Sequence, residues 1–257
     1  MRKAVIPMVV AVLLIVVAGC FRSDGRPPLP KGLTLVKETD HGLFYVCDTD
    51  EDIAEMIDIL SEAFERHYDR ITKMVRYVPR NKTEILICTD KAQFQQMIGR
   101  DTEGTYDADD QRIKVYTPGN LSVAAVRKAY TEQLIHEFVH AVIQQKNPAV
   151  GRIKWLDEGT AYYAAGQLQH ELDSGRRART SVPELSKLMD SERYFETTGG
   201  EAYYFSGLLV KFLYERFGDE AFHQILLDPE SLETILGMPI AELYAQWKAY
   251  VNDLHYT

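Results

Sequence analysis

Two histidines and two glutamates in the middle of the chain have the types and spacing of ligands for a catalytic metal ion. His136, Glu137 and His140 lie in the run Thr131–Ile143, and Glu158 follows in a second run. On a helix, residues i and i+4 lie on one face a turn apart, so both imidazoles can bind one Zn²⁺ ion at about 2.0–2.1 Å. Glu137 points partly sideways and lies beside the open position of the metal without binding it. Glu158 is the expected third ligand.

The surroundings of these residues favour a metal site. Trp155 and Leu156, an apolar pair, precede Glu158 on a helix-like segment. An apolar run with helical periodicity surrounds the two histidines: Leu134, Ile135, Phe138, Val139, Val142 and Ile143. The alternative interpretation is a core helix with two hydrogen-bonded histidines, in which Asp157 and Glu158 are charges that stabilise a helix N-terminus through its macrodipole.

These motifs carry a resemblance to a known family. The pattern His136-Glu137-x-x-His140 followed by Trp155–Tyr163 resembles the gluzincin metallopeptidases, and more narrowly the peptidase MA-like domains of bacterial secreted proteins and lipoproteins. The similarity covers roughly residues 43–253 and also includes Ala202–Ser206, Met238–Leu243 and Trp247. The third ligand comes eighteen residues after His140, one or two fewer than in thermolysin and the large aminopeptidases. The loop between the two motifs absorbs that difference.

The resemblance implies an α+β fold for residues 33–257, a two-lobed, thermolysin-like catalytic domain with a zinc cleft between the lobes. Residues 33–145 are expected to form the N-terminal lobe, a small mixed sheet with helices that includes the metal helix. Residues 146–257 are expected to form a helical C-terminal lobe. The patterning agrees, because strand-like runs end at Cys47, Cys88 and Thr117 and alternate with helical periodicity.

Roles for individual residues follow from the same resemblance. One Zn²⁺ ion is expected on His136, His140 and Glu158, with Glu137 as the general base that activates water. Tyr203 opens an apolar helix and is implied to stabilise the oxyanion. Its neighbour Tyr204 is the rival for that role.

The resemblance also implies where substrate binds. In the family, the strand before the metal helix is a sheet edge that lines the cleft, and such an edge pairs with an extended peptide. That strand is predicted here over Gln111–Thr117, so the expected substrate-binding residues are Arg112, Ile113, Lys114, Val115 and Tyr116. The alternative is an ordinary edge strand protected by its two charges.

The N-terminus predicts export and lipidation. Residues 1–19 have a charged start, an apolar run and small residues before Cys20, which is similar to a bacterial lipoprotein signal peptide. An ordinary signal peptide or a single membrane helix are the alternatives, although the run is short for a span of about twenty residues. Residues 20–32 predict a flexible tether. Phe21 favours the outer membrane in a cell with two membranes, so the domain is expected outside the cytoplasm.

Charge and cysteine content narrow the function further. The formal net charge is −9, and removal of Arg2 and Lys3 brings it near −11, which argues against nucleic acid as a partner. Cys47 and Cys88 end two similar strand-like segments. They form either a disulfide or two buried thiols, and no spacing marks them as zinc ligands.

A zinc metallopeptidase that hydrolyses peptide or protein substrates is the resulting hypothesis. An endopeptidase is favoured, because the Gly-x-Met-Glu-Asn clamp of the large aminopeptidases is absent from the sequence. The alternatives are a lipid-anchored binding module without catalysis and a zinc hydrolase of other substrates. The sequence does not indicate an oligomeric state.

Overall fold

The computed structural model describes residues 25–175 and 180–256. The described residues from Lys31 onward form one compact unit, and those before it belong to a second. The predicted signal segment 1–19 and the predicted lipidation site Cys20 lie outside the described residues. Residues 25–32 lie in neither helix nor strand. No helix within the described ranges is long and apolar enough to cross a membrane.

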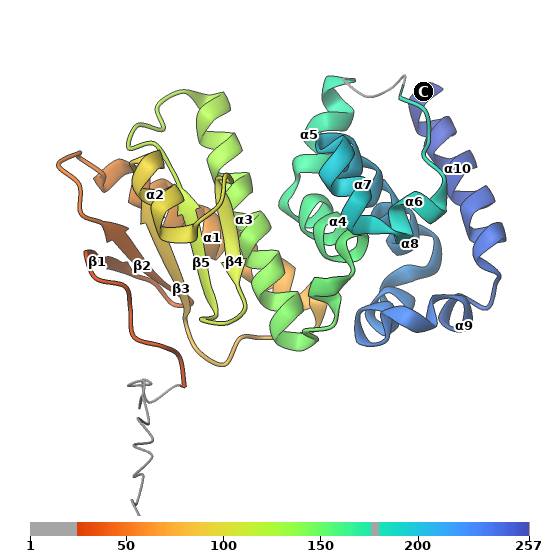
Figure 1. Ribbon diagram of the computed structural model, residues 1–257, viewed down its shortest axis with the longest axis horizontal. Helices are drawn as coiled ribbons and strands as arrows, with labels where there is room; N and C mark the ends of the chain where they lie inside the picture. Colours follow the sequence, from red (N-terminus) through yellow and green to blue (C-terminus); the bar gives the residue numbers. More distant parts are fainter. Residues whose placement is uncertain (1–24, 176–179, 257) are drawn as a thin grey trace, which may run out of the picture. The chain divides into compact units, whose positions relative to one another are not determined.

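Five strands form a mixed sheet in the order β1-β2-β3-β5-β4 (Figure 1). β2, β3 and β5 are parallel, while β1 and β4 pair antiparallel at the two edges. The strands are β1 (Leu33–Glu38), β2 (Gly42–Cys47), β3 (Thr83–Cys88), β4 (Gly104–Asp107) and β5 (Arg112–Tyr116). The patterning predicted β2, β3 and β5, but neither edge strand.

The two faces of the sheet are covered by different helices (Figure 1). The helices on one face, α1 (Ala54–Val75) and α3 (Ala124–Lys146), share the main apolar core with the alternate strand side chains Phe44, Ile85 and Ile113. α2 (Lys91–Ile98) packs its Phe94 against the other face, where a smaller apolar cluster contains two cysteines. α3, which carries His136 and His140, is therefore fixed on the sheet by its apolar side.

Cys47 and Cys88 form a disulfide across β2 and β3, with their Cα atoms 5.0 Å apart. Val46 pairs with Ile87 in these parallel strands, so the next residue of each strand lies beside the other. This register decides between the disulfide and the two free thiols. A disulfide is typical of proteins in oxidising compartments.

The C-terminal part is helical, so the protein has the α+β class expected. Its helices are α4 (Lys154–Ala165), α5 (Gln167–Ser174), α6 (Leu185–Met189), α7 (Ser191–Thr198), α8 (Gly200–Leu227), α9 (Leu232–Leu236) and α10 (Ile240–Tyr256), with 3₁₀ turns at Val150–Arg152 and Pro229–Ser231. Gly166, with φ of 92°, separates α4 from α5. Gly218, with φ of 84°, kinks α8.

α4 and α8 cross at very short distance. A Cβ atom on Gly159 would lie 2.6 Å from the backbone oxygen of Ser206, so only glycine fits at this crossing. Glu158 and Asp157 precede this glycine on α4, and Tyr203 lies one turn before Ser206 on α8. The crossing thus sets where these side chains stand relative to α3.

Candidate metal centre

α3 contributes the first half of the site. The helix buries its apolar residues against the sheet. On its other side His136, Glu137 and His140 are also buried, with exposed fractions of 6%, 3% and 6%. A cavity of about 610 Å³ opens over the polar side of the helix, and all three residues line it. The other walls come from residues 100–106, from α4 and from the start of α8. The histidines therefore face a cavity rather than the core.

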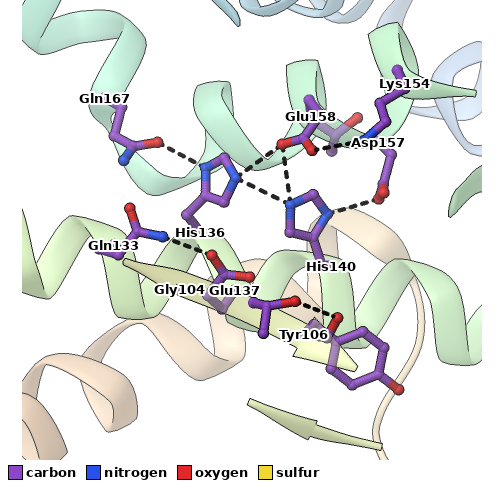
Figure 2. A network of polar contacts seen from close by, with 12 residues as sticks. Gly104, Tyr106, Gln133, His136, Glu137, His140, Lys154, Asp157, Glu158 and Gln167 are labelled. Carbon is purple, nitrogen blue, oxygen red and sulfur yellow. Dashed lines mark hydrogen bonds and ion pairs between the residues drawn. The ribbon is translucent and has the colours of Figure 1, made fainter. Parts of the chain in front are cut away.

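Glu158 reaches the same point from α4 (Figure 2). Its Oε2 lies 3.2 Å from His136 Nε2 and 3.3 Å from His140 Nε2. The two Nε2 atoms are 3.0 Å apart. The His/His/Glu group predicted from the sequence is thus brought together from two helices and could hold a metal ion.

These distances fit a zinc ion. Three ligand atoms of a tetrahedral zinc, each about 2.0–2.1 Å from the metal, lie about 3.3–3.4 Å from one another. The three atoms here are 3.0–3.3 Å apart. Two imidazoles with one carboxylate are also a known catalytic zinc set, which leaves the fourth position for water or substrate.

The far sides of both imidazoles are held by acceptors (Figure 2). His136 Nδ1 lies 2.8 Å from Gln167 Oε1, and His140 Nδ1 lies 2.8 Å from Asp157 Oδ1. Gln144 donates to the other oxygen of Asp157 at 2.9 Å. Because each Nδ1 faces an acceptor, it carries the hydrogen, and the lone pair of each Nε2 is left for a cation. Such partners orient metal-binding histidines and make them more basic.

Electrostatics favour a cation at this point. Burial lowers the pKa of His140, but the charges of Asp157 and Glu158 outweigh it and raise this pKa well above its usual value. Burial raises the pKa of Glu158, yet the charge of His140 and the polar contacts with both imidazoles bring this pKa well below its usual value. The carboxylates of Asp157 and Glu158 thus stabilise positive charge at this point. A divalent ion can take the place of the proton that they hold on His140.

Glu137 is wedged between α3 and the edge strand β4. Gln133, one turn earlier, donates from Nε2 to Glu137 Oε1 at 2.6 Å. A Cβ on Gly104 would lie 2.5 Å from that nitrogen and 2.6 Å from that oxygen. Burial raises the pKa of Glu137, against the opposing charges of His136 and His140. The carboxyl group beside the candidate metal ligands is therefore held in place, and its raised pKa makes it a better proton acceptor.

Tyr203, and not Tyr204, lies at the cavity. The Tyr203 ring centroid is 6.3 Å from that of His136 and 5.0 Å from that of Phe195. Burial raises the pKa of Tyr203, and the charges of Glu158 and Glu137 add to the rise, so its hydroxyl stays protonated as a hydrogen-bond donor. Tyr204 is 1% exposed and packs in the apolar core.

The expectation that Arg112–Tyr116 is an edge strand is wrong. These residues, Arg112, Ile113, Lys114, Val115 and Tyr116, form β5, which pairs with β3 on one side and β4 on the other. Its backbone is therefore used within the sheet. The cavity is lined by β4 instead, through Gly104, Thr105 and Tyr106.

Sequence reasoning missed the groups that support the ligands. Asp157 was considered only as a charge at a helix N-terminus, although it is adjacent to the predicted ligand Glu158. Gln167 is 31 positions from His136, and nothing in the sequence marks it. Gln133 lies one turn before Glu137 on the same helix, and that spacing is a signal that could have identified it.

Comparison with protein-family models and with curated protein sequences finds no match. The metal centre therefore rests on the residues and their geometry alone.

Proposed function

We propose that this protein is a zinc-dependent metallopeptidase of the gluzincin type, with an endopeptidase as the favoured form. The observation that carries the proposal is the convergence of His136, His140 and Glu158, with 3.0–3.3 Å between their ligand atoms, beside the buried carboxyl group of Glu137. In this proposal the sheet and helical parts are the two lobes of one catalytic domain, residues 33–257, and the cavity is its cleft.

Each side chain at the cavity has a separate role in the proposed hydrolysis. A zinc ion bound by the three ligands supplies a Lewis acid that lowers the pKa of water toward about 7. Glu137 takes a proton from the attacking water and passes it to the departing amine. Tyr203 donates its hydroxyl hydrogen to the oxygen on which negative charge develops. Asp157 and Gln167 keep both imidazoles oriented throughout.

The substrate is a peptide or protein segment that lies along β4. Glu103 O accepts a hydrogen bond from Tyr116 N at 2.8 Å, so residue 103 faces β5. By the alternation of an antiparallel pair, the backbone groups of Gly104 and Tyr106 point away from β5, toward the cleft. The Tyr106 N–H already bonds the Glu137 carboxylate, and each of the two carbonyl oxygens accepts one threonine hydroxyl. An extended peptide can pair as an added strand through the remaining acceptor positions of these carbonyls. β4 thus replaces β5 as the candidate for substrate binding.

The test compares wild type with Glu137→Gln, which keeps size and hydrogen bonding but removes the proton acceptor. We expect zinc near one ion per chain in both proteins by elemental analysis, and cleavage of casein by wild type only. Cleavage by neither, with zinc retained, indicates a binding module. A panel of ester and amide substrates then decides whether another hydrolysis takes place.

We also propose that residues 1–19 are a signal peptide, that residues 20–32 are a tether, and that lipidated Cys20 anchors the domain in the cell envelope. Support comes from the small residues before Cys20 and from the Cys47–Cys88 disulfide. Metabolic labelling with a fatty acid should label wild type and not Cys20→Ser. Equal labelling of both proteins contradicts the anchor.

A further inference from the structure

Arg100 has an unusual place at the cleft. It follows Gly99, whose φ of 73° ends α2, and precedes β4. Its guanidinium Nη2 donates to Thr105 Oγ1 on the edge strand. The side chain lines the cavity of the metal centre and also an adjoining cavity of about 420 Å³. Arg100 thus stands where these two cavities meet along β4.

Among the residues that the structure describes, none is a counter-ion for the charge of Arg100. Arg112 pairs with Glu84 at 2.7 Å, and Arg76 pairs with Asp219 and a neighbouring glutamate. For Arg100, by contrast, no carboxylate of the described residues lies within the 4.0 Å of an ion pair, and the hydroxyl that it contacts is neutral. Its charge still acts on the cleft, because it opposes the burial that raises the pKa of Tyr203.

A guanidinium group matches a carboxylate, since two parallel N–H groups can donate to its two oxygens. The contact with Thr105 holds the group against β4, so it lies beside a peptide paired with that strand. We propose that Arg100 binds a carboxylate of the substrate, from an acidic side chain or from the C-terminus of the peptide. The proposal rests on the peptidase function above and names the substrate class of that site.

Cleavage of a peptide library tests the proposal. Peptides from a proteome digest are incubated with the zinc-loaded wild type, and the cut bonds are located by mass spectrometry. A side-chain carboxylate predicts Asp or Glu at one fixed position from the cut bond. A C-terminal carboxylate predicts cuts at one fixed distance from the peptide end. Amidation of all carboxyl groups should remove either preference.

Variants distinguish recognition of the substrate carboxylate by Arg100 from a structural role of Arg100 in supporting β4. Arg100→Gln should lower cleavage of the preferred peptides about 10- to 100-fold more than it lowers cleavage of neutral peptides. Arg100→Lys should lie between it and wild type. Arg80→Gln removes another exposed arginine, outside the cavity, and should change nothing. Thr105→Val removes the hydroxyl that Arg100 contacts, together with the hydrogen bond from that hydroxyl to Tyr106 O, and leaves the charge of Arg100 in place. An equal loss in this variant, on all peptides, assigns Arg100 a structural role and overturns the proposal.

A wild type with no positional or terminal preference also overturns it. If the wild type cuts no peptide, the peptidase function fails, and retention of the same library on immobilised, metal-free protein decides about Arg100. Retention of carboxylate-bearing peptides by wild type and not by Arg100→Gln supports the proposal. Equal retention by both overturns it.

Discussion

Gly159 sets the crossing of α4 and α8, and its substitution tests whether that crossing holds the metal centre together. In Gly159→Ala the new Cβ would meet the backbone oxygen of Ser206 at 2.6 Å and its backbone carbon at 2.7 Å. Both atoms belong to helix backbone, so no side chain can move aside. Ordinary van der Waals contact begins at about 3.4 Å, and the helices must therefore separate by several tenths of an ångström.

The expected change in the free energy of unfolding of Gly159→Ala follows from two opposing effects. Overpacking of this kind costs about 1–3 kcal/mol, while alanine in place of glycine inside a helix stabilises by about 1 kcal/mol. Gly207→Ala is the matched control, because its Cβ meets only side chains: Tyr162 Cδ1 at 3.2 Å and the Leu168 methyls at 3.5 Å. The helix gain is common to both variants. We therefore expect Gly159→Ala to be about 1–3 kcal/mol less stable than Gly207→Ala.

Urea unfolding with EDTA, and again with zinc, measures both effects of the change. Because Glu158 is adjacent to Gly159, a displaced α4 should also weaken zinc binding and reduce the stabilisation that zinc adds. Gly207→Ala should keep that increment. Equal stability of the two variants, or a full zinc increment in Gly159→Ala, refutes the reasoning.

Three further predictions follow. Asp157→Asn should lower zinc affinity about 10- to 100-fold in a chelator competition, because it weakens the acceptor that orients His140; unchanged affinity contradicts this role. Gly104→Ala should lower kcat with zinc content unchanged, because the new Cβ would lie 2.6 Å from Glu137 Oε1; an active Gly104→Ala contradicts the contact. Burial lowers the pKa of Lys146 to about 8. The unfolded chain, with a lysine pKa near about 10.4, therefore binds more protons between these values, and the stability of wild type relative to Lys146→Met should rise with pH from about 8 to about 10.4. A flat difference in urea midpoints across this range contradicts the shift.

The ligand group could be predicted because its information is local. His136 and His140 share a helix face through spacing alone, and the apolar positions around them show the helix period. Glu158 needed one further inference, that the next helix turns back onto the first. The geometry agrees with that inference, since both Nε2 atoms lie within 3.3 Å of its carboxylate.

The edge strand β4 could not be predicted, because it forms through its pairing with β5 and not through the strand propensity of its own residues. β4 is four residues, Gly-Thr-Tyr-Asp, which is short for a strand and has a residue depleted in strands at each end. It pairs with β5 across a tight connection in which Gln111 has a φ of 57°. The disulfide depended in the same way on the parallel register of β2 and β3, which no property of either segment determines.

The consecutive residues Asp157, Glu158 and Gly159 explain why the site is assembled from α4 and not from α3 alone. Successive helix residues point about 100° apart, so neighbouring carboxylates reach different atoms. Asp157 takes the Nδ1 side of His140, and Glu158 takes the Nε2 side of both histidines. Gly159 then brings α4 against α8, whose first turns carry Tyr203. A shift of α4 therefore moves the candidate ligand Glu158 together with Asp157, which supports His140, and it changes their distance to Tyr203. An intact pair of histidines on α3 cannot compensate for that shift.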